Sequence, residues 1–461
     1  MAASPSCAIV VSRADPASVH IGEHLLELAD WERVVDDGRP DGEGGGTVYR
    51  TPGFERREFD ALHLDLEDVA DAFTDPALVV FASKHAGDTG PLLTAHHTGN
   101  FGPADHGGAD GAFATACPNA QARVLDGLSE HAPAEYDIGM ECTHHGPTDV
   151  GAPSMFVELG SSAAEWDDPA GARAVARAIL DCRGVAPSRE RHVVGFGGGH
   201  YVPRFERVVR ETDWAVGHIG ADWGLDAMGD PAGNTNVLRR AFERSGATRA
   251  LVEGDRPALA SAIGDLGYEV VTETWLRETA GVPLDLVSRV EAAIVSVDAG
   301  LRFGDHARAA DRADDGIATV SLPAALLTEA EGIDAEAARA AVERRTVAFD
   351  TDHGGSRLAG RVALRDSDDS GAIVDALAGI LDGEYETIER RDGALVACET
   401  AFDPAAAREA GVPAGPAFGR LVAGEAVTVD GETVEPAAVH TRRERRFPLD
   451  ECDTRRTEGE R

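Results

Sequence analysis

Short β-branched runs alternate with helix-like stretches over the first 275 residues of this chain, and the alternation indicates an α/β domain. Helical periodicity covers residues 118–132 and 169–184, and Gly184 closes the second stretch as a C-cap. We expect a mixed sheet with helices on both faces. The expected strands are residues 7–13, 77–83, 136–142, 155–161, 191–197, 215–220 and 249–255.

Beyond about residue 275 the sequence becomes rich in Ala, Asp and Glu. A chain of 461 residues is also too long for one ordinary core. We therefore expect a first domain of residues 1–275 and an additional C-terminal α+β domain of residues 276–461, to which the sequence assigns no chemistry. Its basic run, residues 440–446, fits either contact with phosphate or pairing with an acidic surface.

Acidic residues dominate the charge of the chain, with 81 acidic against 43 basic residues and a formal net charge of -38. Every basic residue except Lys84 is arginine. Such a surface normally repels nucleic acid. In molar salt, however, the Debye length falls to about 3 Å, which screens both self-repulsion and long-range attraction to phosphate. The composition therefore predicts a halophile's protein.

Several features bear on the compartment of the protein. No apolar stretch approaches the roughly 18 residues of a membrane span, and the N-terminus lacks the basic start and apolar core of a secretory signal. The six cysteines are scattered singly, without the paired spacing of a cysteine zinc site. We expect a cytoplasmic protein with no membrane partner and no obligate protein partner.

Histidines crowd into the first half of the chain, where 13 of the 16 precede residue 220. Histidine serves as a metal ligand and as a proton carrier near neutral pH, so this crowding locates the candidate active site in the first domain. Four segments place histidines just after expected strands, where open α/β sheets form their ligand crevices.

The first segment, residues 81–102, contains Lys84 and His85 at a strand end, then the pair His96 and His97, and Asn100. A lone lysine in an arginine-using chain predicts a specific contact, either holding a phosphate or stabilising an oxyanion. A surface lysine without a role would look the same.

The second segment, residues 140–162, puts Glu141 three residues before His144, with His145 adjacent. One carboxylate and two imidazoles make a first shell for zinc, whose catalytic sites usually have three protein ligands and a water. Strand-like alternation would let only part of this trio point into one cleft. Glu158, on the next strand, is either an orienting carboxylate or a buried, satisfied one.

The third segment, residues 193–205, runs into glycines, followed by His200 and Tyr201. Gly198 and Gly199 allow close backbone approach by a ligand, although a plain tight turn would look similar. The fourth segment ends on His218, which fits a substrate contact or a hydrogen-bonded core histidine. Together the four segments predict a hydrolase in which a bound metal polarises water or a carbonyl and side chains move protons.

The ordered motifs FASKH, HHTGN, ECTHHGP, VELGSS, GGGHYVP and GHI resemble those of archaeal and plant D-aminoacyl-tRNA deacylases. The resemblance covers roughly residues 5–275. It implies zinc-dependent hydrolysis of the ester that joins a D-amino acid to tRNA, as chiral proofreading, and a fold similar to peptidyl-tRNA hydrolase and nucleoside-phosphorylase-like proteins.

The resemblance also implies roles for individual residues. Glu141, His144, His145 and His200 would surround the zinc ion, with His96 rather than His97 close by, and Glu141 would share in catalysis. Lys84 would meet the ester or the terminal phosphate, beside a catalytic His85. The substrate-binding residues would be Asn100, Gly198, Gly199, Tyr201 and His218.

Two other functions fit the same residues. A zinc hydrolase acting on a small acylated amino acid or peptide-like amide could use the same glutamate and histidines without RNA. A non-catalytic RNA-binding or scaffold protein is the alternative from another class, and the histidines at strand ends argue against it. If the substrate is tRNA, binding should depend on base stacking, 2′-hydroxyl contacts and a few arginines, because salt screens attraction to phosphate.

Overall fold

The computed structural model describes all residues except 1–5, 309–315, 366–368, 450–454 and 457–461. The chain forms two compact units, Met1–Ala280 and Gly281–Arg461. No helix in the described ranges is long and apolar enough to cross a membrane.

Unit 1 is built on an eight-stranded mixed sheet with the order β2-β3-β4-β1-β5-β8-β6-β7. β1, β4, β5 and β8 run parallel, whereas β6 pairs antiparallel with β8 and parallel with β7. The strands are β1 (Cys7–Ser12), β2 (Glu32–Asp36), β3 (Gly46–Thr51), β4 (Phe54–Phe59), β5 (Leu78–Lys84), β6 (Leu92–His96), β7 (Asp137–Met140) and β8 (Ser154–Gly160).

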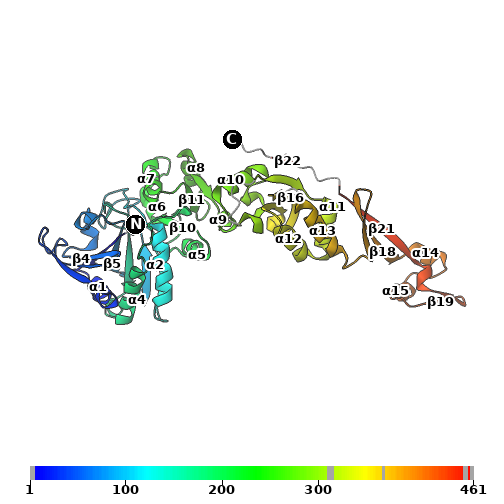
Figure 1. Ribbon diagram of the computed structural model, residues 1–461, viewed down its shortest axis with the longest axis horizontal. Coiled ribbons are helices and arrows are strands. Elements are labelled where there is room, and N and C mark those ends of the chain that lie inside the picture. Colours follow the sequence, from blue (N-terminus) through cyan, green and yellow to red (C-terminus); the bar gives the residue numbers. More distant parts are fainter. Residues whose placement is uncertain (1–5, 309–315, 366–368, 450–454, 457–461) are drawn as a thin grey trace. The chain divides into compact units, whose positions relative to one another are not determined.

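Among the described residues, the α-helices that pack on this sheet lie on one face, whereas the expectation was helices on both faces (Figure 1). They are α1 (Pro16–Leu28), α2 (Pro118–His131), α3 (Ala163–Trp166) and α4 (Pro169–Leu180). On the other face, Val10, Phe81 and Phe156 pack against 3-10 turns η1 (His63–Asp65) and η2 (Val69–Ala72) and the loops near Ala114 and Val150. A few apolar side chains fill the space under these short turns. The turns do not cover the whole face of the sheet, and a cavity lies beside them.

A second, parallel sheet in unit 1 has the order β10-β9-β11-β12, with helices packed on it. Its strands are β9 (His192–Phe196), β10 (Ala215–Gly220), β11 (Arg249–Val252) and β12 (Glu269–Val271). The accompanying helices are α5 (Pro203–Glu211), α6 (Asp222–Met228), α7 (Thr235–Ser245), α8 (Pro257–Asp265) and α9 (Glu273–Thr279). The expected strands of this region therefore belong to a separate sheet.

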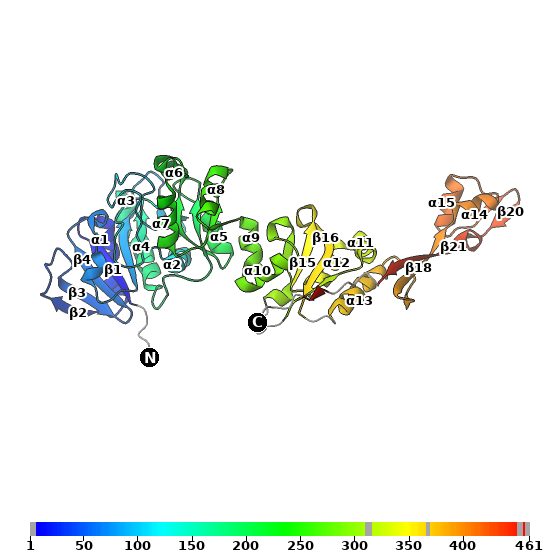
Figure 2. The ribbon, with the colours of Figure 1, turned by 90° about the horizontal axis from the view of Figure 1, so that it is seen from above.

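Unit 2 combines antiparallel sheets with helices (Figure 2). Its sheets are β13-β15-β16-β14-β22, β17-β18-β21 and β19-β20. The strands are β13 (Leu301–Phe303), β14 (Ala318–Ser321), β15 (Ala348–Asp352), β16 (Arg357–Leu364), β17 (Thr387–Arg391), β18 (Ala394–Phe402), β19 (Val427–Val429), β20 (Glu432–Val434), β21 (His440–Pro448) and β22 (Arg455–Arg456). The helices are α10 (Leu284–Ala293), α11 (Ala324–Ile333), α12 (Ala335–Glu343), α13 (Asp369–Leu381), α14 (Pro404–Glu409) and α15 (Pro416–Val422).

One detail differs from the sequence-based expectations, and another bears on the two alternatives for the basic run. Helix α4 ends at Leu180 with Asp181 as its C-cap, and Gly184 follows in the left-handed region at φ 71°. The basic run of residues 440–446 lies in strand β21 and is largely exposed. Within it, Arg445 pairs with Glu329, and Glu444 pairs with Arg391, so part of its charge is used inside unit 2.

Candidate active site

The candidate site lies on the loop-covered face of the large sheet, beside the middle of β8. Because β6 runs antiparallel to β8, the C-terminal His96 of β6 pairs with Phe156 rather than with the end of β8. β7 runs parallel to β6, so Glu141, directly after β7, comes to the same level. Strand pairing thus collects residues far apart in the sequence on one patch of sheet.

The loop after β7 is held in place by backbone contacts. The Cys142 N–H donates to the carbonyl of His200 at 2.9 Å, which joins this loop to the glycine turn after β9. His145 has a left-handed backbone with φ 46°. This bend turns His144 and His145 toward His96. Only part of the trio lines the cavity, as expected: His144 and His145 do and Glu141 does not, although the cause is this bend after the strand rather than alternation along it.

His96, His144 and His145 form a cluster of three imidazoles, with ring centroids 4.2 to 4.9 Å apart. Each Nδ1 contacts a backbone carbonyl: that of His97 at 3.1 Å, of Cys142 at 2.8 Å and of Gly146 at 2.6 Å, respectively. A carbonyl only accepts hydrogen bonds, so Nδ1 carries a proton in each ring, and Nε2 keeps a lone pair wherever the ring is neutral. Metal-binding histidines are commonly oriented in this way.

Burial and neighbouring charges move the pKa values of these three imidazoles in different directions. Burial and the nearby His96 lower the pKa of His145 to about 4 and the pKa of His144 well below its ordinary value. Burial would also lower the pKa of His96, but contact with Glu158 raises it. His144 and His145 are therefore neutral near pH 7, which is the form that binds a metal.

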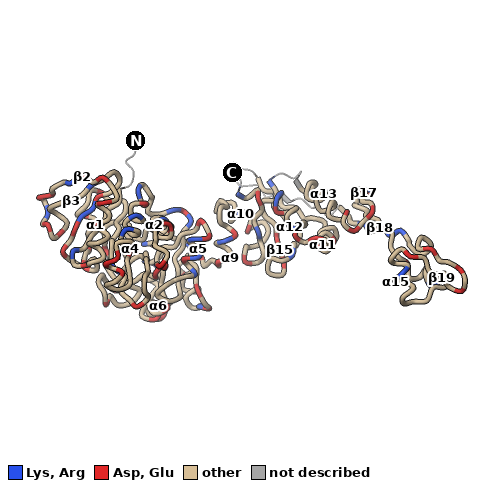
Figure 3. Tube along the Cα trace, turned by 90° about the horizontal axis from the view of Figure 1, so that it is seen from below, with Lys and Arg blue, Asp and Glu red and all other residues tan. Residues whose placement is uncertain are grey.

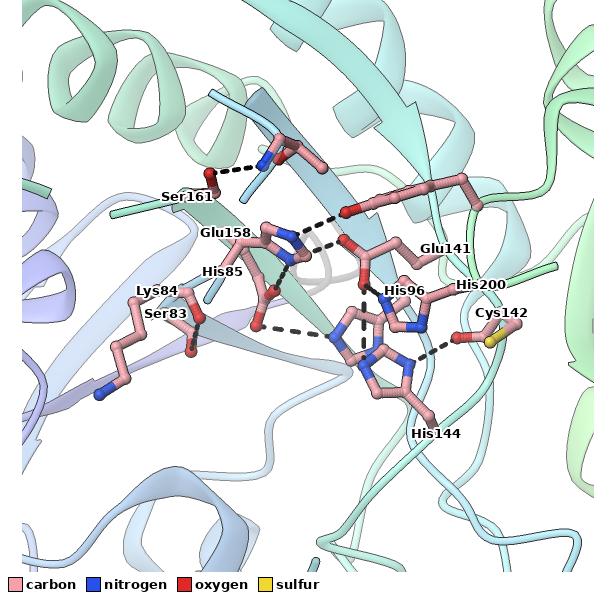
Figure 4. Close-up of polar contacts among 12 residues, drawn as sticks. Ser83, Lys84, His85, His96, Glu141, Cys142, His144, Glu158, Ser161 and His200 are labelled. Atoms are coloured by element: carbon pink, nitrogen blue, oxygen red, sulfur yellow. Dashed lines mark hydrogen bonds and ion pairs between the residues drawn. The ribbon is translucent and has the colours of Figure 1, made fainter. Parts of the chain in front are cut away.

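Glu141 is the buried carboxylate at the centre of the site (Figure 4). Its Oε2 lies 2.9 Å from Nε2 of His200 and 3.7 Å from Nε2 of His144, and its Oε1 lies 3.1 Å from Nδ1 of His85. Burial would raise the pKa of Glu141, but the contacts with His200 and His85 lower it well below its ordinary value. The carboxylate is thus ionised in a nearly dry site.

His85 lies between two carboxylates and a phenol. Its Nδ1 is 3.1 Å from Glu141 and 3.5 Å from Glu158, and its Nε2 is 2.9 Å from the Tyr201 hydroxyl. Burial would lower the pKa of His85, but Glu141 and Glu158 raise it to about 11. Glu158 also lies 3.6 Å from His96 Nε2, so it connects His85 and His96, the two histidines whose pKa values are raised.

The donor set fits a metal ion. Neither carboxylate oxygen of Glu141 nor Nε2 of His96 completes a hydrogen bond within the described part of the chain, although charged groups approach them. Such buried polar atoms are costly unless a ligand satisfies them. His96, His144 and His145 offer ligand atoms within 4.8 Å of one another, and so do His85, Glu141 and His200. Cys142 is less suited, because burial and the charge of Glu141 raise the pKa of its thiol to about 12.

A cavity of about 440 Å³ opens beside the cluster. Several residues that line this cavity were not predicted from the sequence. Asp15 caps α1 and also accepts the Lys84 N–H at 2.9 Å, and burial raises the pKa of its carboxyl. An Asp-Pro pair signals only a helix start, so nothing in the sequence connected Asp15 with the site. The cavity is lined by Asp15, Leu62, His63, Leu64, Ser83, Lys84, His85, Ala86, His144, His145, Phe156, Glu158 and His200.

Lys84 lines this cavity, but its ammonium group does not reach the histidines. The Nζ atom lies 5.3 Å from the ring centroid of Trp166, and the side chain points away from the cluster (Figure 4). Alternation along β5 explains this, because Ser83 faces the site and Lys84 therefore faces the other way.

None of the five predicted substrate-binding residues lies in the cavity lining: Asn100, Gly198, Gly199, Tyr201 and His218 are all outside it. Asn100 donates its amide to the carbonyls of Gly107 and Ala109 in its own loop. His218 is fully buried, with both ring nitrogens in contacts to Thr143 and Ala114, as a core histidine would be.

The glycine turn after β9 lies behind His200. Gly198 has φ 85°, and its carbonyl accepts the Asp222 N–H at 2.9 Å. Neither Gly198 nor Gly199 lines the cavity, so the turn positions His200 and Tyr201.

Comparison with known proteins gives a consistent result. A family model described as D-aminoacyl-tRNA deacylase matches residues 72–271. The D-aminoacyl-tRNA deacylase of Halorubrum lacusprofundi is 53% identical over 96% of this chain and 97% of its own length. The chain belongs to the D-aminoacyl-tRNA deacylase family. Another member, from Natronomonas pharaonis, is 54% identical over 95% of this chain and 99% of its own.

More distant members of the D-aminoacyl-tRNA deacylase family also match along the full chain. That of Methanococcoides burtonii is 34% identical over 97% of both chains. A solved structure, of a conserved protein of unknown function, matches with a TM-score of 0.53 and 26% identity, covering 60% of this chain and 98% of its own.

Proposed function

We propose that this chain hydrolyses the ester joining a D-amino acid to the terminal ribose of tRNA, with zinc as its cofactor, in the cytoplasm where tRNA is charged. Free tRNA and D-amino acid would be the products. The observation that carries the proposal is the set of neutral imidazoles with free Nε2 atoms around the buried Glu141, in a member of a family named for this reaction.

Glu141, His144, His145 and His200 are the proposed zinc ligands, with His96 beside them. The distances from Glu141 Oε2 to His144 and His200, 3.7 and 2.9 Å, bracket the spacing of about 3.4 Å between ligands in a tetrahedral zinc site with bonds near 2.1 Å. Bound zinc would lower the pKa of water and polarise the ester carbonyl.

Proton transfer is assigned to the charged residues next to these ligands. His85 is held by Glu141 and Glu158 and lines the cavity, so it is placed to give a proton to the ribose oxygen as the ester bond breaks. Glu158 keeps His85 and His96 oriented. Tyr201 contacts His85 at 2.9 Å and fixes the ring from the other side.

The cavity beside the ligands suits the aminoacyl part of the substrate. Leu62, Leu64 and Phe156 give it an apolar wall for a side chain. Because Lys84 points away from the histidines, we assign it to a phosphate at the rim rather than to the ester carbonyl. All of these residues lie in unit 1, which we propose as the catalytic domain.

The first experiment measures release of D-tyrosine and L-tyrosine from charged tRNA by the full chain in high potassium chloride, with and without a chelator. We expect release of the D form only, lost on chelation and restored by zinc. Release of neither form by folded, zinc-loaded protein would contradict the proposed substrate and favour a hydrolase of small acylated amino acids.

Ligand variants test the site itself. His144→Ala and His200→Ala should each lower zinc content and reduce turnover at least 100-fold, because each removes one ligand. His353→Ala, an exposed histidine of unit 2, is the matched control and should change neither quantity. Intact zinc content and turnover in both ligand variants would show the assignment to be wrong.

A further inference from the structure

Trp223 stands out among the exposed side chains of unit 1. It is 52% exposed, whereas Trp214 and Trp275 are buried and Trp31 and Trp166 are half-buried. An indole exposed to this degree leaves about half of its apolar area in water, so folding stabilises it much less than a buried tryptophan.

The position of Trp223 connects it to the candidate active site. Its indole lies close to the thiol of Cys142. The Cys142 sulfur in turn lies within 4.8 Å of ring nitrogens of His144 and His200. The preceding residue, Asp222, donates its N–H to the Gly198 carbonyl in the turn that carries His200. Only one side chain therefore separates the exposed indole from two proposed zinc ligands.

The indole lies next to Cys142, outside the lining of the substrate cavity. Lys84 belongs to the cavity lining, and in Figure 4 Cys142 lies on the far side of the histidines from Lys84. Trp223 is absent from the lining residues of that cavity in the described chain. The candidate site thus has a cavity beside the histidines and, outside the lining of that cavity, an exposed indole next to Cys142.

We propose that Trp223 is a stacking platform for a nucleobase at the acceptor end of the RNA substrate. This inference rests on the proposed function. The scissile ester and the terminal base are attached to the same ribose, so a substrate with its aminoacyl group in the cavity carries a base within one sugar of the ester. The Trp223 indole is one side chain away from the proposed ligands and stacks on that base.

Stacking suits this chain because its other source of RNA affinity is weak. With a net charge of -38, long-range attraction to phosphate is absent, and salt screens the remaining contacts. Base stacking on an aromatic ring contributes about 1–3 kcal/mol per base without any need for opposite charge.

The direct test is tryptophan fluorescence of the full chain titrated with the trinucleotide CCA in high potassium chloride. We expect saturable quenching in the native protein, no quenching in Trp223→Phe and native quenching in Trp31→Phe, the matched control. Absence of quenching in the native protein, or its persistence in Trp223→Phe, would overturn the proposal.

Kinetics provide a second test that separates this site from the proposed function. Trp223→Ala should raise KM for D-tyrosyl-tRNA about tenfold with kcat nearly unchanged, whereas Trp223→Phe should retain most of the affinity. The KM for D-tyrosine methyl ester, which has no base, should not change. Equal KM values for native protein and Trp223→Ala on tRNA would refute the platform and leave the hydrolase assignment intact. If the native protein releases neither D- nor L-tyrosine, the hydrolase assignment fails, and the fluorescence titration still decides the platform.

Discussion

At the scale of single residues, Glu158 is the carboxylate that contacts both His85 and His96. It is buried and lies 3.5 Å from His85 and 3.6 Å from His96. Contacts with His85 and His96 lower its pKa despite burial, so it is ionised. A carboxylate in this position orients neighbouring imidazoles, and loss of such an orienting contact typically costs 10- to 100-fold in metal affinity or activity.

Glu158→Gln is therefore expected to weaken zinc binding or turnover about 10-fold or more, with little change in far-UV circular dichroism. Zinc affinity is measured by competition with a chelator, and turnover is measured on D-tyrosyl-tRNA. Glu23→Gln, an exposed glutamate on α1, controls for the loss of one charge. Unchanged zinc affinity and turnover in Glu158→Gln would instead assign Glu158 a purely packing role.

At the scale of elements, α5 and α9 are joined through Glu273. Its carboxylate lies 3.2 Å from Arg204, 2.8 Å from Arg207 and 3.0 Å from Arg277. These contacts lower the pKa of Glu273 to about 2, against the effect of partial burial. The folded pKa lies below the unfolded value, so this contribution to stability is complete above about pH 4.5 and is lost as the pH falls toward 2.

Glu273→Gln should lower Tm at neutral pH by about 2 to 4 °C at low salt, the shift expected for about 1 kcal/mol in a unit of this size. The difference from the native protein should shrink in molar potassium chloride and below pH 4. Glu269→Gln removes a single, half-exposed pair with Arg249 and should shift Tm less. Equal Tm values for the two variants would show that the three arginine contacts of Glu273 stabilise the fold no more than the single contact of Glu269.

Elements also show why sequence reasoning was incomplete. Apolar strands such as β1 and β5 were predicted because their residues are buried on both faces. Strand β4 was missed because it contains Arg56 and Arg57, which are buried only because Glu58 and Asp36 neutralise them. The histidines of the site were predicted from their residue type, whereas Asp15 and Phe156 belong to it only through tertiary pairing.

At the scale of the whole molecule, charge governs how RNA can bind. Acidic residues occur along both units, and arginines are interspersed among them (Figure 3). Many of the described arginines pair with carboxylates, as Arg445 does with Glu329 in unit 2. Each such pair leaves one cation fewer to displace counterions from phosphate, and the observed binding constant depends on salt in proportion to the number of cations that contact phosphate.

We therefore expect the affinity for tRNA to fall less steeply with potassium chloride than it does for basic RNA-binding proteins. We choose potassium chloride between 0.5 and 3 M, a range that includes 1 M, where the screening length is about 3 Å. Over this range the slope of log K against log salt should correspond to only a few phosphate contacts. Trp223→Ala should lower the affinity at every salt concentration without changing this slope, because stacking releases no counterions. A steep slope, equivalent to many released counterions, would instead indicate a focused arginine surface, and β21 would be the first place to look for it.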